Sequence, residues 1–273
     1  MSIRKPAVAG YFYPAGKQEL EKTIVSLMGK DLSVHKKNRI KGIILPHAGY
    51  QYSGAVAAET IVSSDLKNTL IMLGPNHTGL GESFSVMVAG SWQMPFGNVE
   101  IDSPLAKKIV EGSRYLRDDV LAHRSEHSIE VLIPFLQFIK KEIKIVPIIV
   151  ARADMKTYQA IAEDIVRAIS DLKIKEEISI IASSDMTHYE SQESAKKKDN
   201  VAIEAILNLH TDELIRNVDD LNITMCGIAP VAIMMEIVKA LGAKQGYLVK
   251  YQTSGDVTGD YSSVVGYAGV RIN

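Results

Sequence analysis

The chain has 273 residues, of which 46% are hydrophobic and 23% charged, as in an ordinary globular protein with a substantial core. The formal net charge is −1, so bulk electrostatics predict neither nucleic acid nor a membrane surface as a partner. No apolar run approaches the ~20 residues that span a bilayer, and no signal peptide is evident at the N-terminus. A single cysteine, Cys226, excludes an intramolecular disulfide, so we expect a cytoplasmic protein.

Helical patterns recur along the whole chain. Residues 18–28 carry apolar side chains at helical spacing, and residues 31–38 form a polar, basic connector in which we expect His35 to be solvated. Residues 53–64 predict a helix of small side chains, which suits close packing either in the core or at a subunit interface. Further helices are predicted at 103–111, 154–169, 191–209, 211–221 and 231–241.

Short apolar runs between the helices predict buried strands, at residues 39–45, 68–73, 143–150 and 178–182. Residues 83–90 alternate with period two and are expected to form a hairpin with residues 97–102. Two more strands, at 245–253 and 262–272, close the chain. The turn-rich connection between them, residues 254–261, predicts that these last two strands are antiparallel.

The order of these elements predicts the fold class. Strands alternating with helices favour a parallel sheet, and the antiparallel pair at the end makes the sheet mixed. No repeat, low-complexity stretch or linker divides the sequence. We therefore expect residues 1–273 to form a single α/β domain, with a mixed, largely parallel central sheet flanked by helices.

Polar side chains follow three of the predicted strands directly. His47 comes after the first strand, His77 after the second, and Asp185 and His188 after the fourth. Ligands of open α/β sheets bind beyond the carboxyl ends of the strands. The three strand ends therefore predict one shared site, although a single histidine in such a place is often a structural residue held by hydrogen bonds.

Cys226 is a further candidate because it lies just before the helix predicted at 231–241. A helix N-terminus lowers the pKa of a nearby thiol, so we expect a thiolate there. Two imidazoles and one anionic ligand make a three-ligand metal site with open positions. The alternative is that Cys226 is a small buried apolar side chain.

His123 and His127 are four residues apart and have Glu126 and Glu130 beside them. This spacing is not that of a zinc protease, because Glu126 directly precedes the second histidine. One interpretation is helix capping and surface polarity. The functional alternative is that His127 and Glu130 orient a ligand or a metal-binding side chain.

Several other kinds of site find no support in the sequence. The chain has neither a GxxxxGK[ST] loop nor a GxGxxG turn that opens a helix, so no nucleotide or organic cofactor is expected. A GxSxG nucleophile elbow is also missing. The connection at 254–261 contains acidic residues that would suit a lid, but turn chemistry alone explains its composition.

Taken together, the motifs resemble those of the Memo family, and the likeness covers essentially the whole chain in order. Prokaryotic members of that family are also described as protein B of the AmmeMemoRadiSam system. The segments that carry the resemblance are Leu45-Pro-His47-Ala-Gly-Tyr, Gly74-Pro-Asn-His77, Glu126-His-Ser-Ile-Glu130, Ser183-Ser-Asp185-Met-Thr-His188 and Met225-Cys226-Gly.

The resemblance implies a fold similar to that of class III extradiol dioxygenases, which use non-haem iron. It implies that His47 and His77 match metal-ligand positions, that Cys226 matches the third, and that Asp185 and His188 line the same cleft. His188 resembles the region of an acid–base histidine. The dioxygenases complete their site with a carboxylate, whereas a thiolate favours copper(I), iron or zinc. Ring cleavage is therefore not expected.

Two hypotheses about function follow. The first is an iron- or copper-dependent oxidoreductase of unknown substrate, with zinc as an alternative ion. Its residues would be His47, His77 and Cys226 as ligands, Asp185 as an orienting or fourth ligand, His188 as general acid–base, and His127, Glu130 and Tyr50 at the substrate.

The second hypothesis is a non-catalytic module whose cleft holds a peptide or small molecule. Eukaryotic members of the Memo family are regarded as mediators of receptor-driven motility, which implies peptide binding. The AmmeMemoRadiSam name implies instead a functional link to a radical S-adenosylmethionine protein.

Overall fold

Four isoleucine-rich segments form the centre of the sheet. The structure is a computed structural model that describes residues 2–29 and 37–273, so the connector with His35 lies outside the described residues. The four segments are parallel neighbours in the order β10-β5-β11-β3. Nearly all their side chains are buried, as expected for strands covered on both faces. Their bounds are β3 (Gly42–Leu45), β5 (Thr69–Pro75), β10 (Lys144–Val150) and β11 (Ile178–Ser183).

The sheet continues on both sides of this centre. Beyond β3 lies the antiparallel strand β14 (Val264–Ile272), which also pairs with β13 (Gly246–Thr253) and β12 (His188–Glu190). The antiparallel pairing predicted for the last two strands is thus confirmed. On the far side of β10 the sheet ends with β8 (Val99–Ile101), β7 (Ser91–Trp92) and β1 (Ile3–Arg4).

The hairpin predicted between residues 83–90 and 97–102 is right in its second strand and its turn but wrong in its first strand, because β8 pairs antiparallel with β7 (Ser91–Trp92) and not with residues 84–86. Instead, β6 (Phe84–Val86) pairs with the second half of β10 and with β9 (Arg117–Asp118). β8 covers only Lys144 and Ile145 of β10, which leaves the hydrogen-bonding edge of the last β10 residues for β6. Alternation of side chains predicts a strand but cannot name its partner.

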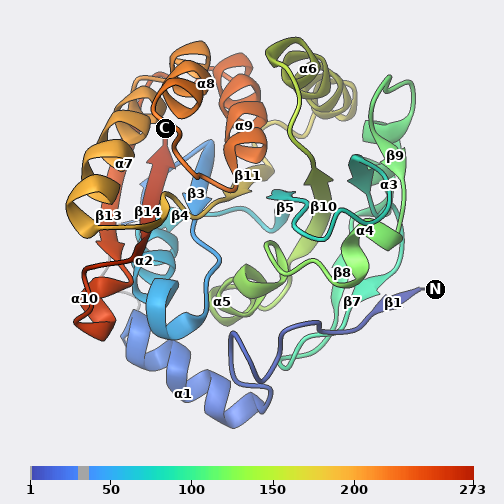
Figure 1. The fold of residues 1–273 in the computed structure, drawn as a ribbon. Coiled ribbons are helices and arrows are strands. Elements are labelled where there is room, and N and C mark those ends of the chain that lie inside the picture. Colours follow the sequence, from blue (N-terminus) through green and yellow to red (C-terminus); the bar gives the residue numbers. More distant parts are fainter. Residues whose placement is uncertain (1, 30–36) are drawn as a thin grey trace.

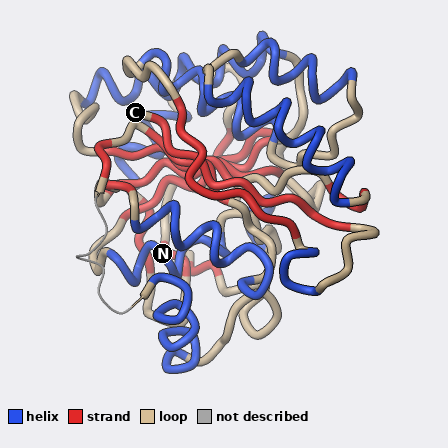
Figure 2. Tube along the Cα trace, turned by 90° about the vertical axis from the view of Figure 1, so that its left-hand side faces the viewer, coloured by secondary structure: helices blue, strands red, loops and turns tan. Residues whose placement is uncertain are grey.

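Helices cover both faces of the sheet, which makes a single α/β domain of three layers (Figures 1 and 2). One layer holds α1 (Lys17–Met28), α2 (Tyr50–Val62) and α5 (Ile133–Ile139). The other holds α3 (Ser103–Val110), α6 (Met155–Leu172), α7 (Gln192–Leu207), α8 (Thr211–Asp220) and α9 (Ile228–Ala240).

Local sequence explains where these helices begin and what they cover. The Asp154 side chain caps α6 by accepting the Thr157 N–H at 2.8 Å. In contrast, α9 is buried almost all round, because it lies between the sheet and α6 and α8. Short helices complete the chain: α4 (Leu121–Arg124), the 3-10 turn η2 (Glu130–Leu132) and α10 (Gly255–Thr258). A two-stranded sheet of β2 (Asn38–Arg39) and β4 (Ser64–Asp65) lies apart.

Within residues 2–29 and 37–273, the structure has no helix that is both long and apolar enough to cross a membrane.

The small side chains of α2 serve close packing against the sheet. A Cβ atom added to Gly269 of β14 would lie 1.9 Å from the Thr60 hydroxyl oxygen and 3.1 Å from Val56 Cγ1. Gly54 also lies close to Leu27 of α1, because an added Cβ would be 2.8 Å from a Leu27 methyl group. The helix is therefore held in the core between α1 and β14.

We expect Gly269→Ala to lower the free energy of unfolding by about 1–3 kcal/mol, because the added methyl group overpacks a core that has no space for it. Urea denaturation followed by circular dichroism measures this change. Gly16→Ala is the matched control, since a Cβ atom there has no neighbour within 4 Å. Equal stability of the two variants would contradict the packing described.

Candidate metal centre

The carboxyl ends of the central strands open into one cavity of about 420 Å³. Because β3, β5 and β11 are parallel, their ends lie along the same edge of the sheet. This brings together residues that are far apart in the sequence, as the strand endings predicted. The cavity is lined by His47, His77, His127, Asp185 and His188, with Phe12 from the N-terminal loop.

His47 presents a free ring nitrogen to Cys226. The His47 Nδ1 atom lies 2.6 Å from the Ser183 hydroxyl oxygen, and that hydroxyl donates its proton to the Ser128 carbonyl. His47 Nδ1 must therefore carry the hydrogen, which leaves a lone pair on Nε2. Nε2 lies 3.4 Å from Cys226 Sγ. Burial lowers the pKa of His47, and the neighbouring histidines lower it further, so the ring is neutral.

His77 is held in the same tautomer by Glu126. Its Nδ1–H donates to Glu126 Oε1 at 2.9 Å, and its backbone N–H donates to Oε2 at 2.6 Å. Burial would raise the pKa of Glu126, but the hydrogen bonds from His77 and from the Ser128 N–H hold it at about 2. The carboxylate is thus an acceptor, and the lone pair of His77 is on Nε2.

Cys226 completes the group. The Asp185 backbone N–H points at the sulfur, 3.2 Å away. Burial raises the pKa of the thiol, and the nearby Asp185 carboxyl raises it further. The thiolate expected from the helix N-terminus is therefore not favoured by the protein alone. The physical reason is that the cost of burying a charge exceeds the effect of α9, which begins two residues later.

The donor atoms fit a small transition-metal ion. Ligand atoms of His47, His77 and Cys226 all lie within 4.8 Å of one another. A tetrahedral ion holds imidazole nitrogen at about 2.0 Å and thiolate sulfur at about 2.3 Å, which places the two donors roughly 3.5 Å apart. The separation of His47 Nε2 and Cys226 Sγ is close to this value. Metal binding would also displace the thiol proton, whatever its pKa in the free protein.

Asp185 and His188 lie beside this group on the cavity wall. Asp185 Oδ1 accepts the His47 backbone N–H at 2.8 Å. Burial raises the pKa of Asp185 to about 6, although that N–H and the nearby His188 oppose the shift. His188 donates Nδ1–H to the Thr224 carbonyl at 2.9 Å, so its Nε2 can accept a proton. The next residue, Tyr189, has a positive φ of 61° and an 80% exposed ring at the rim.

No role was predicted from the sequence for two residues of the site, Glu126 and Phe12. Glu126 is buried and contacts both His77 and His127, and Phe12 packs edge-on against the His127 ring at 4.9 Å between centroids. The rings of His77 and His127 stack 4.7 Å apart. A signal for Glu126 was present, because it directly precedes His127. The role of Phe12 had no local signal.

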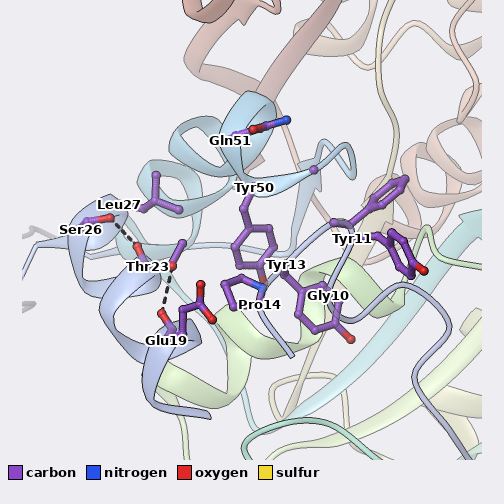
Figure 3. A pocket seen from close by; sticks show the side chains of 12 residues that line it. Gly10, Tyr11, Tyr13, Pro14, Glu19, Thr23, Ser26, Leu27, Tyr50 and Gln51 are labelled. Carbon is purple, nitrogen blue, oxygen red and sulfur yellow. Dashed lines mark hydrogen bonds between the residues drawn. The ribbon is translucent and has the colours of Figure 1, made fainter. Parts of the chain in front are cut away.

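The structure corrects the expectation that Glu130 and Tyr50 contact a substrate. Glu130 has no exposed surface, and the Tyr50 hydroxyl donates to the Val131 carbonyl at 2.9 Å. Neither side chain lines the cavity that contains the histidines. Tyr50 instead borders an adjoining hollow of about 460 Å³ (Figure 3). Both polar groups are turned inward because they satisfy buried partners from other segments.

Two further interpretations are also settled by local contacts. His123 is fully buried rather than a surface residue, with Nε2 2.9 Å from the Ser85 hydroxyl, and burial lowers its pKa to about 3. In the 254–261 connection, Asp256 accepts the Thr253 N–H and Asp260 accepts the Ser262 N–H. These two acids stabilise turns of their own segment, as turn chemistry predicts.

Comparison with known proteins shows the family of the chain. The chain is 44% identical to a MEMO1 family protein of Methanopyrus kandleri over 278 residues, which covers 98% of each chain. A MEMO1 family protein of Aquifex aeolicus is 44% identical over 271 residues and 99% of each chain. The crystal structure of an uncharacterized protein from Escherichia coli K12 shares the fold at 14% identity, with a TM-score of 0.51 over 86% of this chain and all of that one. The family model described as Memo-like protein matches residues 4–271. The chain therefore belongs to the Memo family.

Proposed function

We propose that this Memo family protein binds one transition-metal ion through His47, His77 and Cys226. The observation that carries the proposal is the direction of the two imidazoles. Each ring donates Nδ1–H to a fixed oxygen, on Ser183 for His47 and on Glu126 for His77. Oxygen partners of this kind orient the histidine ligands of metal sites. Both Nε2 lone pairs are thereby free, and they lie beside Cys226, the only cysteine in the sequence.

The ligand set suits copper(I), iron or zinc, because it combines two borderline imidazoles with one soft thiolate. A bound iron or copper ion would supply electron transfer. We therefore propose, more specifically, that the protein is an oxidoreductase. His188 would then exchange a proton with the ligand through Nε2. Asp185 would hold the His47 backbone, and the Phe12 ring would keep water from the His127 side of the cavity.

A second candidate function is non-catalytic binding of a peptide or small molecule in the same cavity. The exposed aromatic rim supports it. Tyr11 is 89% exposed and Tyr189 is 80% exposed, and both border the cavity. Exposed aromatic side chains beside a concave site are typical of binding surfaces.

Metal binding tests the first proposal directly. The protein is purified without added metal and titrated anaerobically with iron(II), copper(I) and zinc(II). We expect one equivalent of at least one ion, and more than about 100-fold weaker binding in Cys226→Ala, since loss of a ligand exceeds the effect of losing a residue behind one. His210→Ala is the control, because His210 lies at the exposed start of α8, outside the cavity, with its ring beside Glu213.

A wild-type protein that takes up none of the three ions would contradict the metal proposal. Non-catalytic binding of a peptide or small molecule would then be the remaining candidate function. Oxygen uptake with catechol separates the Memo site from ring-cleaving dioxygenases. We expect little or no uptake, because the carboxylate ligand of those enzymes has no counterpart in the proposed ligand set.

A further inference from the structure

Two buried glutamates flank the turn that carries His127. Glu126 and Glu130 are 1% and 0% exposed, and each accepts hydrogen bonds from four donors. We infer that both are positioning residues that build two adjoining walls of the cleft without touching its ligand. Glu126 holds the histidine wall, formed by His77 and His127. Glu130 holds the aromatic wall, formed by Tyr11 and Phe12. The part that concerns metal affinity rests on the proposed metal site, and the rest is independent of it.

Glu126 ties two histidines to one point. Oε2 accepts the His77 N–H at 2.6 Å, while Oε1 accepts His77 Nδ1–H, the His127 N–H and the Ser128 N–H, each at 2.9 Å. The carboxylate thus fixes the tautomer and the direction of the His77 ring. It also fixes the turn from which the His127 ring reaches back to stack on His77.

A role for Glu126 as a metal ligand is disfavoured by the same contacts. One of its oxygens lies within 4.8 Å of ring nitrogens of His77 and His127, so these three residues form a second group of potential ligands. An ionised carboxylate offers about four lone-pair sites, two on each oxygen. Three N–H groups already share Oε1, and a fourth donates to Oε2 at 2.6 Å. A metal ion at Oε1 would have to displace buried backbone donors. Glu126 therefore acts through the histidines.

Glu130 has the same saturated pattern but serves the N-terminal loop. Its Oε2 accepts from Arg4 Nη1 at 2.5 Å and the Ala7 N–H at 2.8 Å. Its Oε1 accepts the Val8 N–H at 3.0 Å and the Tyr13 hydroxyl at 2.7 Å. Both ends of the loop between Ala7 and Tyr13 are thus fastened to one buried side chain.

That loop forms a wall shared by two hollows. Tyr11 and Phe12 border both the cavity of the histidines and the adjoining hollow beside α1. Figure 3 shows the hollow beside α1 with Tyr11 at its edge. The Phe12 ring contacts His127, and the Phe12 carbonyl accepts the Tyr50 N–H at 2.8 Å. The position of this wall sets the width of the cleft. Because Glu130 holds the wall in place, it determines indirectly which ligands fit.

The pair of variants Glu126→Gln and Glu130→Gln tests the inference, since each is the control for the other. Amide hydrogen exchange over residues 7–13 reports the wall. Long-range proton–nitrogen NMR of the histidine rings in metal-free protein reports the His77 tautomer. Cobalt(II) titration, followed by sulfur-to-cobalt absorption, reports metal affinity.

In Glu126→Gln, the side-chain NH2 group takes the place of one carboxylate oxygen and faces an N–H group of His77. Two donors repel each other, so the His77 ring moves away from its acceptor. Without that acceptor Nδ1–H is no longer favoured, and we expect the Nε2–H tautomer of His77 to appear. We also expect cobalt(II) to bind about 10–100-fold more weakly, with exchange over residues 7–13 unchanged. For Glu130→Gln we expect about 10-fold faster exchange over residues 7–13. The His77 tautomer should be that of the wild type. The affinity for cobalt(II) should stay within about 2-fold of the wild-type value, well below the roughly 10–100-fold loss that follows when a residue supporting a ligand is removed.

The inference is overturned if Glu126→Gln leaves the tautomer unchanged, or if Glu130→Gln leaves the exchange unchanged. Failure of wild-type protein to bind cobalt(II) would count against the metal site alone, because the tautomer and exchange measurements need no metal. If Glu130→Gln does not fold, Tyr13→Phe removes one donor to Glu130 and is expected to speed exchange over the same residues. If Glu126→Gln does not fold, Glu126→Asp retracts the carboxylate and is expected to produce the same tautomer change.

Discussion

Replacement of His47 by alanine is expected to weaken metal binding by more than about 100-fold, because a lost ligand costs more than a lost residue behind a ligand. The fold should survive this change. Ser183 keeps its hydrogen bond to the Ser128 carbonyl, and the space left by the ring opens into the cavity, where water can enter. Isothermal titration with zinc(II) and thermal unfolding measure the two properties separately.

His127→Ala is the matched control for His47→Ala. Its ring lies in the same cavity, 5.5 Å from the His47 ring between centroids, but it is not part of the group of His47, His77 and Cys226. We expect its zinc(II) affinity to stay within about 100-fold of the wild type, as for a residue outside the ligand set. If the two variants lose affinity equally, the ligand set proposed for the metal is wrong.

Arg4→Met is expected to lower the free energy of unfolding by about 3–5 kcal/mol, because it leaves a buried carboxylate without its charged partner. The guanidinium is almost fully buried and donates to Glu130, to the Glu126 carbonyl and to the His123 carbonyl. It also lies over the Trp92 ring, 4.2 Å from the centroid, which adds a cation–π contact. Urea denaturation gives the change in free energy.

Arg39→Met provides the comparison for Arg4→Met. Arg39 pairs with Glu176 at 2.9 Å, but both side chains are more than half exposed. Solvent screens such a pair, so we expect little change in stability. A small effect of Arg4→Met would show that the N-terminal segment is not fastened to Glu130 as the contacts indicate, and would also weaken the inference on the aromatic wall.

The two glutamates of the His127 turn show why the site could be only partly predicted from the sequence. The motif Glu126-His-Ser-Ile-Glu130 indicated that both acids belong to a functional region. The orienting role was predicted for Glu130 alone, whereas Glu126 is the acid that accepts the hydrogen bonds of His77. The deciding partner of Glu130 is Arg4, 126 residues away, and no spacing rule along the chain reports such a contact.

The chain's own amino-acid order determined the central strands and the residues that follow them. Isoleucine-rich runs buried on both faces specify parallel strands. The residues that follow parallel strands all lie at the same edge of the sheet. This is why His47, His77, Asp185 and His188 could be placed together before the structure was known. The antiparallel pair at the end of the chain followed in the same way from its turn-rich connection.

Only the tertiary structure decided the partner of β6, the inward direction of Glu130 and Tyr50, and the protonation that burial favours for Cys226. Each of these depends on atoms brought together across the fold, such as His47 and Cys226, which are 179 residues apart. Hydrogen bonds and desolvation act over a few ångströms in space. Local patterns fix which segments form strands and helices, whereas the energies of buried polar groups are set by neighbours that only the folded chain supplies.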